Sequence, residues 1–525
     1  MSEASLIMHL EIAMKKTSLL FIFLLLLFII TGMSTGSQDE KIQRTVSETF
    51  FLDFHDFGRY GIEDQYYVSP DNSRLAYVTF REDKKASVML DGKELKKFPN
   101  ILERSVVFSP DNSKISYVAQ EKTEQFIKTF VVVNEQENKN FDFVIPGIQS
   151  FSPDSKRIAY IAQDRKLQKT FVVMDETELV YDCYPVLESI QFSSDSKHYA
   201  YLCKQPDEKQ MVILDGKPQL PYDEISALIY SSKGDHVAYT AQKDKKWYLL
   251  VDGNIKNMPM AHYTSIDRLR YSPDGRKLVF VAKVDNKSVV VFNSKEGNMY
   301  DNIIGDVFFS PDSNQMAYVT FNKKTNKKIV ILNGKGLKEY DDIGGPALRT
   351  GSQKINLVFS PDSKHLAYTA YSNSNKSKFV VVDGKEGAPY YDIIEAPLFS
   401  HDSSHITYQA QLIIDMKIQK TSEDKTKIEY TTEKRKKNVV VLDSQEFNTY
   451  EQSEGIVMSP DSKFTAFRAT QDNQSFVVIN SNEGSKYDKI ISPVVFDSPD
   501  EIHYLVMKIN DIYLIREKLN MGSEK

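Results

Sequence analysis

The sequence is poor in tryptophan, cysteine and histidine, and these shortages limit the chemistry that it can support. It contains one tryptophan, two cysteines and nine histidines among 525 residues. No C-x-x-C pair, glycine-rich phosphate loop or EF-hand loop occurs, so the common motifs for thiol chemistry, nucleotide binding and calcium binding are missing. We therefore expect neither a metal nor a cofactor.

A strong charge of one sign is also missing. The formal net charge is −6, and 26% of the residues are charged. This mild imbalance argues against a general nucleic-acid surface, so we expect no nucleic-acid partner. Tyrosine and phenylalanine, with 29 and 30 copies, are plentiful, and aromatic enrichment favours strands.

Long hydrophobic runs are rare, and the clearest one lies near the N-terminus. Lys15 and Lys16 precede the apolar run Leu19–Ile30. Its 12 residues fall short of the roughly 20 that a spanning helix needs. Positive residues, a short apolar core and small residues make a secretory signal peptide, which we place at residues 1–36.

The signal peptide predicts the compartment of the mature protein. Ser34 and Gly36 are the small residues expected before a cut that leaves Ser37 first, and Met14 is a candidate true start. We expect a periplasmic or secreted protein with no stable membrane span after cleavage. The alternative is a protein that an uncleaved leader anchors to the membrane.

One ten-residue stretch, Phe151–Tyr160 (FSPDSKRIAY), recurs along the chain. Eleven copies occur, mostly 38 to 43 residues apart, with two longer intervals of 50 and 59. Their serines are Ser69, Ser109, Ser152, Ser193, Ser231, Ser272, Ser310, Ser360, Ser400, Ser459 and Ser498. A catalytic serine is needed once, so eleven copies favour structure, and Ser-Pro-Asp suits a type I turn between two strands.

A second turn signal follows each Ser-Pro-Asp turn by about 20 to 25 residues. Its clearest copies are Asp91-Gly92, Asp215-Gly216, Asp252-Gly253, Asn333-Gly334 and Asp383-Gly384. These dipeptides accept the positive φ angles of a type I′ hairpin turn. Each unit therefore predicts four antiparallel strands in about 40 residues, which is the size of one β-propeller blade.

An aromatic-acid pair precedes most of the next units. The pairs are Phe141-Asp142, Tyr181-Asp182, Tyr222-Asp223, Tyr300-Asp301, Tyr340-Asp341, Tyr391-Asp392 and Tyr487-Asp488. A blade buries its two faces only against its neighbours. We expect the aromatic rings to pack between blades; contact with a ligand is the alternative.

The aromatic-Ser-Pro-Asp run followed by apolar-Ala-Tyr resembles the WD-like β-propeller repeats of the TolB type. The likeness covers about residues 65 to 515. TolB itself carries an α/β domain ahead of a six-bladed propeller. Fewer than 35 residues separate Ser37 from the first Ser-Pro-Asp turn, so we expect no such domain here, and the Tol-Pal partnership is not carried over. Such repeats also precede the catalytic domain of prolyl-oligopeptidase-like peptidases, and we expect no hydrolase domain after the eleventh unit.

The fold class is therefore all-β, a β-propeller of about eleven four-stranded antiparallel blades. One ring usually has four to eight blades, so we favour two rings, with one large ring as the alternative. Repeats one to seven occupy residues 48–343 and repeats eight to eleven residues 356–516, although a five-plus-six split is nearly as good. The last unit lacks a convincing fourth strand, and residues 48–62 could supply it.

The other long interval comes from residues 411–437. This segment lies between a second and a third strand, so we expect an extended hairpin that projects from one face. The basic end, Lys434 to Lys437, favours a solvated loop; a partner-binding arm is the alternative.

The two cysteines, Cys183 and Cys203, flank the fourth Ser-Pro-Asp-like turn. An exported protein could oxidise them, and we treat a disulfide as a hypothesis, because propeller geometry does not guarantee their proximity.

Two motifs that suggest chemistry have ordinary explanations. Gly32-Met33-Ser34-Thr35-Gly36 matches G-x-S-x-G, but a nucleophile elbow needs a strand before it and a helix after it. His401 and His405 stand four apart, which suits metal binding on a helix, but here they span a hairpin turn. We therefore assign no catalytic and no metal-binding residue.

The sequence favours an exported, non-enzymatic, TolB-like propeller that serves the cell envelope as a binding scaffold for a protein or other ligand. A propeller enzyme, a hydrolase or lyase on glycans or peptides with its site at the central channel, is the alternative. An acid, histidine or arginine cluster at one channel mouth would favour the enzyme. A sensor ectodomain is a third hypothesis, if the leader is uncleaved.

Overall fold

The fold is known from a computed structural model of the whole chain. The described residues are 28–29, 42–53, 66–80, 84–122, 126–256, 263–344, 355–421, 428–509 and 511–521. These residues form strands, turns and bends but no helix. A helix that could cross a membrane therefore does not occur among them. The predicted cleavage site before Ser37 and the Gly32–Gly36 motif lie outside the described residues.

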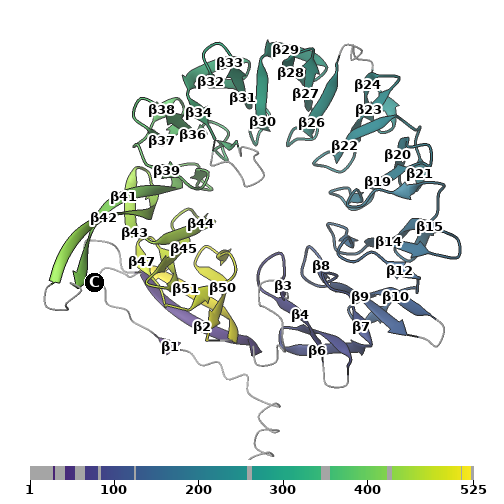
Figure 1. Cartoon of the computed structure of the whole chain (residues 1–525), viewed down its shortest axis with the longest axis horizontal. Helices are drawn as coiled ribbons and strands as arrows, with labels where there is room; N and C mark the ends of the chain where they lie inside the picture. Colours follow the sequence, from purple (N-terminus) through teal and green to yellow (C-terminus); the bar gives the residue numbers. More distant parts are fainter. Residues whose placement is uncertain are drawn as a thin grey trace, which may run out of the picture.

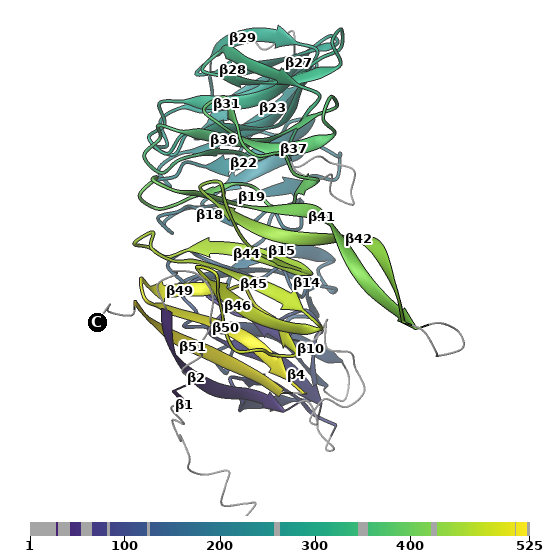
Figure 2. The ribbon, with the colours of Figure 1, turned by 90° about the vertical axis from the view of Figure 1, so that its left-hand side faces the viewer.

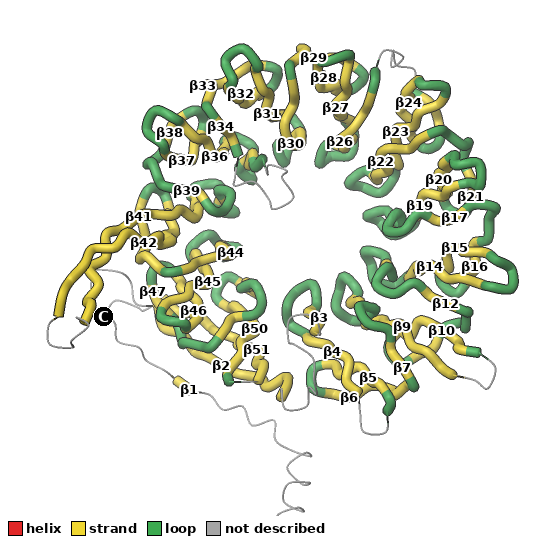
Figure 3. The backbone as a smooth tube through the Cα atoms, viewed as in Figure 1, coloured by secondary structure: helices red, strands yellow, loops and turns green. Residues whose placement is uncertain are grey.

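Eleven antiparallel sheets stand around one ring, with the first blade beside the last (Figure 1). The all-β propeller of eleven four-stranded blades is confirmed. We favoured two rings from the sequence, and this was wrong. The structure has the alternative arrangement, a single large ring. The strands in Figure 3 follow one another around the ring in chain order, except that β2 completes the last blade beside β51.

Each blade begins with a short strand at the inner side of the ring, which is often split in two. The inner strands are β3 (Tyr66–Val68), β7 (Asn100–Ile101) with β8 (Val107–Phe108), β12 (Phe143–Val144) with β13 (Ser150–Phe151), β17 (Tyr184–Pro185) with β18 (Gln191–Phe192), β22 (Glu224–Tyr230), β26 (Ser265–Tyr271), β30 (Asn302–Phe309), β34 (Asp342–Ile343) with β35 (Leu357–Phe359), β39 (Asp392–Ile393) with β40 (Leu398–Phe399), β44 (Gln452–Met458), and β48 (Lys489–Ile490) with β49 (Val495–Ser498).

The second and third strands form the centre of each blade. The second strands are β4 (Leu75–Phe80), β9 (Ile115–Lys122), β14 (Ile158–Asp164), β19 (Tyr199–Lys204), β23 (Val237–Lys243), β27 (Leu278–Val284), β31 (Met316–Asn322), β36 (Leu366–Ser372), β41 (Ile406–Thr421), β45 (Thr465–Gln471) and β50 (Glu501–Lys508). The third strands are β5 (Ala86–Leu90), β10 (Ile127–Val133), β15 (Lys169–Met174), β20 (Gln210–Leu214), β24 (Lys246–Val251), β28 (Lys287–Phe292), β32 (Lys327–Leu332), β37 (Ser377–Val382), β42 (Ile428–Leu442), β46 (Gln474–Ile479) and β51 (Asp511–Met521).

The outer strands complete the blades. They are β6 (Lys93–Phe98), β11 (Gln136–Glu137), β16 (Thr177–Leu179), β21 (Lys217–Pro218), β25 (Asn254–Ile255), β29 (Lys295–Tyr300), β33 (Lys335–Tyr340), β38 (Lys385–Glu386), β43 (Gln445–Tyr450), β47 (Asn482–Glu483) and, for blade eleven, β2 (Ile42–Asp53).

The Asp-Gly turns adopt the predicted geometry. Asp91 and Gly92 have φ angles of 50° and 78°, so both central residues lie in the left-handed region, as a type I′ turn requires. β5 and β6 consequently meet with Leu90 opposite Lys93. The local sequence thus fixes the register of this hairpin.

Apolar side chains on both faces of each blade are buried by the neighbouring blades. Blades one and two share a cluster that includes Ala76, Val88, Tyr117 and Phe130. Corresponding clusters occupy the other ten junctions, including blades seven with eight and blades eleven with one. Burying one such side chain contributes about 1.5–3 kcal/mol, so most of the stabilisation comes from these junctions.

The aromatic rings of the aromatic-acid pairs pack between blades, as expected. The Phe141 ring meets the Tyr160 ring edge-on at 6.3 Å, and the rings of Tyr340 and Tyr368 repeat this contact at the same distance. At the ninth blade we predicted that Tyr391 would pack between blades, but its side chain is 47% exposed. The adjacent Tyr390 is buried there instead.

The N-terminal strand closes the ring. β2 pairs with β51, from Ile42 opposite Met521 to Asp53 opposite Asp511, and so supplies the outer strand of the last blade. It starts six residues before the segment 48–62 that we proposed for this place. The short strand β1 (Phe28–Ile29) pairs with β2. The first two and the last described strands therefore meet in one sheet.

Arg44 joins this N-terminal strand to the tenth blade. Its guanidinium donates to the carbonyl of Val477 at 3.1 Å and to the carbonyl of Asn482, and it lies 3.3 Å from the Glu517 carboxylate. The Glu517 side chain is fully buried and also accepts the Tyr504 hydroxyl. One arginine thus neutralises a buried carboxylate and bridges two blades.

Replacement of Arg44 by alanine should destabilise the ring strongly. The change leaves the Glu517 carboxylate buried without its cation, which typically costs about 3–5 kcal/mol. Chemical unfolding followed by circular dichroism measures the loss. Lys169→Ala, which breaks the exposed pair with Asp182, is the control and should cost about 1 kcal/mol or less. Equal stability of the two variants would contradict this role for Arg44.

Candidate functional site

The Ser-Pro-Asp turns are held by hydrogen bonds within the turn. In the third blade the Ser152 hydroxyl donates to Asp154 at 2.6 Å, and the Lys156 NH donates to the same carboxylate at 3.2 Å. The Arg157 NH donates to the Ser152 hydroxyl at 3.0 Å. These bonds stabilise the charged carboxylate and hold the pKa of Asp154 below its usual value. The serine therefore stabilises the turn.

The fourth residue of the turn links neighbouring blades. Ser155 has a φ of 59° and accepts the Asp111 NH of the preceding blade at 3.1 Å. The same bond recurs between Asp154 and Ser196 at 2.9 Å. It also joins the turns beginning at Ser272 and Ser310, Ser310 and Ser360, Ser360 and Ser400, and Ser400 and Ser459. Sequence reasoning missed this link because it assigned roles only to the first three turn residues, serine, proline and aspartate.

Glycine takes the fourth turn position in the fifth and sixth blades, at Gly234 and Gly275. A Cβ atom on Gly234 would lie 2.8 Å from Oδ1 and 2.9 Å from the NH of Asp195 in the preceding blade. A positive φ of 79° also favours glycine at this position. Hydrogen bonds from Ser193 and from the Lys197 NH still lower the pKa of Asp195 to about 2.

The described histidines, which are His198, His236, His365, His401, His405 and His503, lie in different blades except for His401 and His405. Four of them make the same contact with the aspartate or equivalent residue of the second turn in their own blade. The pairs are His198–Asp215, His236–Asp252, His365–Asp383 and His405–Asp443. His405 uses its Nδ1 for this contact, and no group of three metal-ligating side chains occurs among the described residues. From the sequence we had assigned no metal site to His401 and His405.

His503 connects the last blade to the first. Its Nδ1 lies 2.8 Å from the Asp497 carboxylate, and its Nε2 donates to the Asp71 carbonyl at 2.7 Å. The side chain is buried. This polar contact therefore supports the ring at the junction where the chain has its two ends.

Charged groups of the inner strands are also used between blades. Arg268 donates to the Ile303 carbonyl at 3.0 Å, and Arg270 meets Asp306 of the next blade at 3.0 Å. On the other side of the ring, the Gly455 NH donates to Glu395 at 2.8 Å. These groups hold neighbouring inner strands together.

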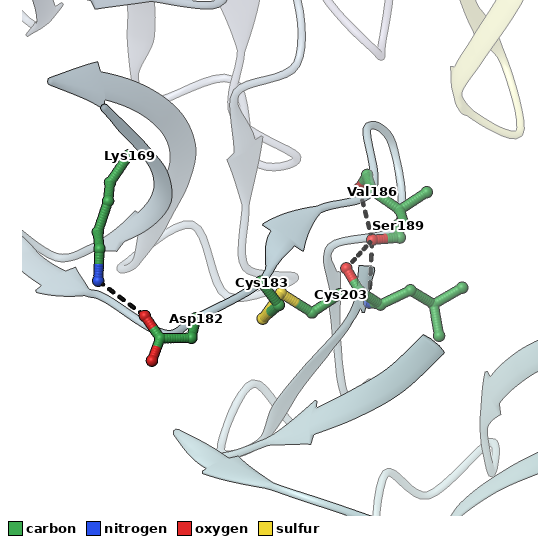
Figure 4. The surroundings of a disulfide bond; sticks show 7 residues. Lys169, Asp182, Cys183, Val186, Ser189 and Cys203 are labelled. Atoms are coloured by element: carbon green, nitrogen blue, oxygen red, sulfur yellow. Dashed lines mark hydrogen bonds and ion pairs between the residues drawn. A yellow bond between two sulfur atoms is a disulfide. The ribbon is translucent and has the colours of Figure 1, made fainter. Parts of the chain in front are cut away.

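The two cysteines meet in the fourth blade (Figure 4). A disulfide joins Cys183, just before β17, to Cys203 in β19, with the Cα atoms 5.6 Å apart. Both residues are buried. Nearby, the Ser189 hydroxyl donates to the Val186 carbonyl at 2.6 Å and accepts the Leu202 NH at 3.0 Å. The bridge therefore fastens an interrupted inner strand to its blade.

The hairpin of β41 and β42 extends far beyond the ninth blade, as expected from its length (Figure 2). Within the described part of the chain, residues 412–421 and 428–437 pair only with each other. We call these two segments the arm. The outer edges of the arm therefore carry backbone groups without ladder partners.

The root of the arm is fixed to the ring. The Lys437 ammonium donates to Gln471 of the tenth blade at 3.0 Å and lies 3.7 Å from Glu451. The Lys436 ammonium lies 4.5 Å from the centre of the Tyr391 ring. Ile413, which pairs with Lys436, is 45% exposed. The arm thus leaves the ring in a defined direction with an apolar residue on its surface.

No protein-family model and no curated protein matches the sequence. Solved structures match the fold at low similarity. A eukaryotic initiation factor is 14% identical with a TM-score of 0.37, covering 74% of this chain and 90% of its own. A putative TolB from Agrobacterium tumefaciens is 15% identical with a TM-score of 0.24, covering 56% and 94%. The Cps50 (Swd1) propeller domain from Myceliophteria thermophila is 14% identical with a TM-score of 0.23, covering 62% and 96%. These similarities concern the propeller architecture alone.

Loss of the disulfide should lower stability without changing the fold. The bond closes a loop with a sequence separation of 20, and the loop-entropy model assigns about 3 kcal/mol to a loop of this length. Urea unfolding of Cys183→Ser/Cys203→Ser against the oxidised parent measures the difference. Addition of a reductant should destabilise the parent and leave the double variant unchanged. A parent that is insensitive to reductant would contradict the bond.

Proposed function

We propose that the protein is a non-enzymatic scaffold of the cell envelope that binds a protein partner through its arm. The observation that carries this proposal is the arm itself, a two-stranded ribbon that extends beyond the blade to which it belongs. An isolated two-stranded hairpin is at best marginally stable in water. A bound partner strand would satisfy its unpaired edges and cover Ile413.

The charge of the arm favours an acidic partner surface. Lys434, Arg435 and Lys436 are exposed, and the chain as a whole carries a net charge of −6. Complementary charge speeds encounter and selects partners more than it adds affinity. Export through residues 1–36 belongs to the same proposal and would place the ring in the periplasm or outside the cell.

The propeller enzyme is the competing function. It would need a cluster of chemically available groups at the ring centre. The engagement of Arg268, Arg270 and Glu395 in contacts between blades supports the scaffold instead.

Removal of the arm should abolish partner binding and preserve the ring. An Asn-Gly turn in place of residues 412–437 would connect Gln411 directly to Asn438, its pairing partner, in a short hairpin. A photo-crosslinking residue placed at Ile413 in the native cell should yield one defined protein adduct. The same residue at Lys217, an exposed position at the outer strand β21, is the control.

The two competing results are distinct. Identical adducts from positions 413 and 217, or none from either, would contradict a role for the arm. Turnover of a glycan or peptide that persists after arm removal would favour the enzyme.

A further inference from the structure

One face of the ring is formed by the turns that connect the second and third strands of each blade. Strands alternate in direction and every blade repeats the same order, so these turns share one face, and the Ser-Pro-Asp and Asp-Gly turns share the other. We call the first the hairpin face. The arm is the longest hairpin of this face and leans outside the ring in Figure 1, so it leaves the other tips uncovered.

The hairpin tips of blades five to eight are rich in lysine, and Asp223, Asp301 and Asp341 of the same face accept backbone NH groups of these tips. The tips Lys243–Lys246, Lys283–Lys287, Asn322–Lys328 and Ser372–Lys378 contain eleven lysines and two aspartates. The lysines exposed on them include Lys243, Lys245, Lys246, Lys283, Lys323, Lys324 and Lys376. Four consecutive blades therefore present positive charge on a protein whose net charge is −6.

Acids on the same side neutralise only some of these lysines. Lys287 pairs with Asp301 at 2.5 Å, and Lys378 pairs with Asp392 at 2.6 Å. Lys328 pairs with Asp342. These pairs use lysines close to the blade body, so the charge at the outermost positions of the tips stays available to a ligand.

Acids occur on the opposite face as well. The second turns of blades two and three contain Glu135, Glu137, Asp175, Glu176 and Glu178. The same face also exposes Lys217, Lys335 and Lys385, so the two faces differ in where their lysines are concentrated and not in the presence of charge.

A run of exposed apolar side chains occupies the hairpin face next to the ring junction. Phe80 is 59% exposed, Phe126 is 52%, Leu167 is 58% and Ile509 is 85%. They belong to blades one, two, three and eleven, which are consecutive because the last blade packs against the first. Each lies at or beside a hairpin tip, so the four residues form one arc around the ring.

We propose that the hairpin face docks onto a bilayer that contains anionic phospholipid. Lysines near an anionic membrane attract it, and apolar side chains at loop tips enter the boundary between headgroups and acyl chains. A soluble polyanion or a nucleic acid would use the lysines but would leave the apolar arc exposed. This inference goes beyond the scaffold function and does not depend on the arm.

Vesicle co-sedimentation of the full-length folded protein tests the proposal. The protein should bind vesicles of phosphatidylcholine with 30% phosphatidylglycerol about tenfold or more tightly than pure phosphatidylcholine, and added salt should weaken the binding. Lys323→Gln/Lys324→Gln/Lys376→Gln should reduce binding to the anionic vesicles about tenfold or more. Lys217→Gln/Lys335→Gln/Lys385→Gln, on the opposite face, is the matched control and should bind as the parent does.

A second pair of variants separates a bilayer from a soluble polyanion. Phe80→Ser/Leu167→Ser/Ile509→Asn should bind anionic vesicles at least fivefold more weakly and heparin as the parent does. Asparagine replaces Ile509 because the φ angle there is 59°, a left-handed conformation that asparagine adopts more readily than serine. Leu187→Ser, at an exposed leucine between β17 and β18, is the control and should bind both as the parent does.

Three results would overturn the proposal: no binding to anionic vesicles, equal loss in the opposite-face control, or full vesicle binding by the apolar triple variant. Circular dichroism confirms that each variant is folded before binding is compared. The arm-deleted protein should keep vesicle binding, so failure of the scaffold function and failure of membrane docking are told apart.

Discussion

Burial between neighbouring blades is the constraint on which the molecule depends. A four-stranded sheet of about 40 residues has two apolar faces and no core of its own. Each face is covered only when the next blade stands beside it, as Tyr117 and Phe130 show at the first junction. An open ring would leave two faces exposed to water, so closure by β2 and β51 completes the burial as well as the last sheet.

Polar side chains also connect neighbouring blades. The serines and aspartates that resemble a catalytic cluster in the sequence are turn residues, and the fourth residue of many turns reaches the preceding blade. Arg44, His503 and Arg268 likewise use their hydrogen bonds across junctions. The polar groups thus align blades whose stability comes from apolar contact. The arm and the hairpin tips extend beyond these contacts between blades.

Local sequence predicts the blade well. The Ser-Pro-Asp and Asp-Gly turns are determined by backbone preferences of their own residues, so turn type, strand order and blade number follow from the repeats. The buried ring of Phe141 is predictable for the same reason, because it recurs at one place in each unit.

Properties that depend on many junctions together are harder to predict. A small rotation per blade decides between one ring and two, and no single residue encodes it. The proximity of Cys183 and Cys203 follows from the way β17 pairs with β19, which their spacing does not reveal. Arg44 reaches Val477 over a separation of 433 residues, so only the closed ring brings them together. The hairpin face was missed because its lysines are spread over four repeats and gather only when the blades stand side by side.

Electron microscopy of single particles viewed along the ring axis tests the closed arrangement most directly. We expect face-on averages with eleven blades in one unbroken ring and an extra projection beside the ninth blade. Two smaller rings, or one ring with a gap between the first and last blades, would contradict the burial of every blade by two neighbours.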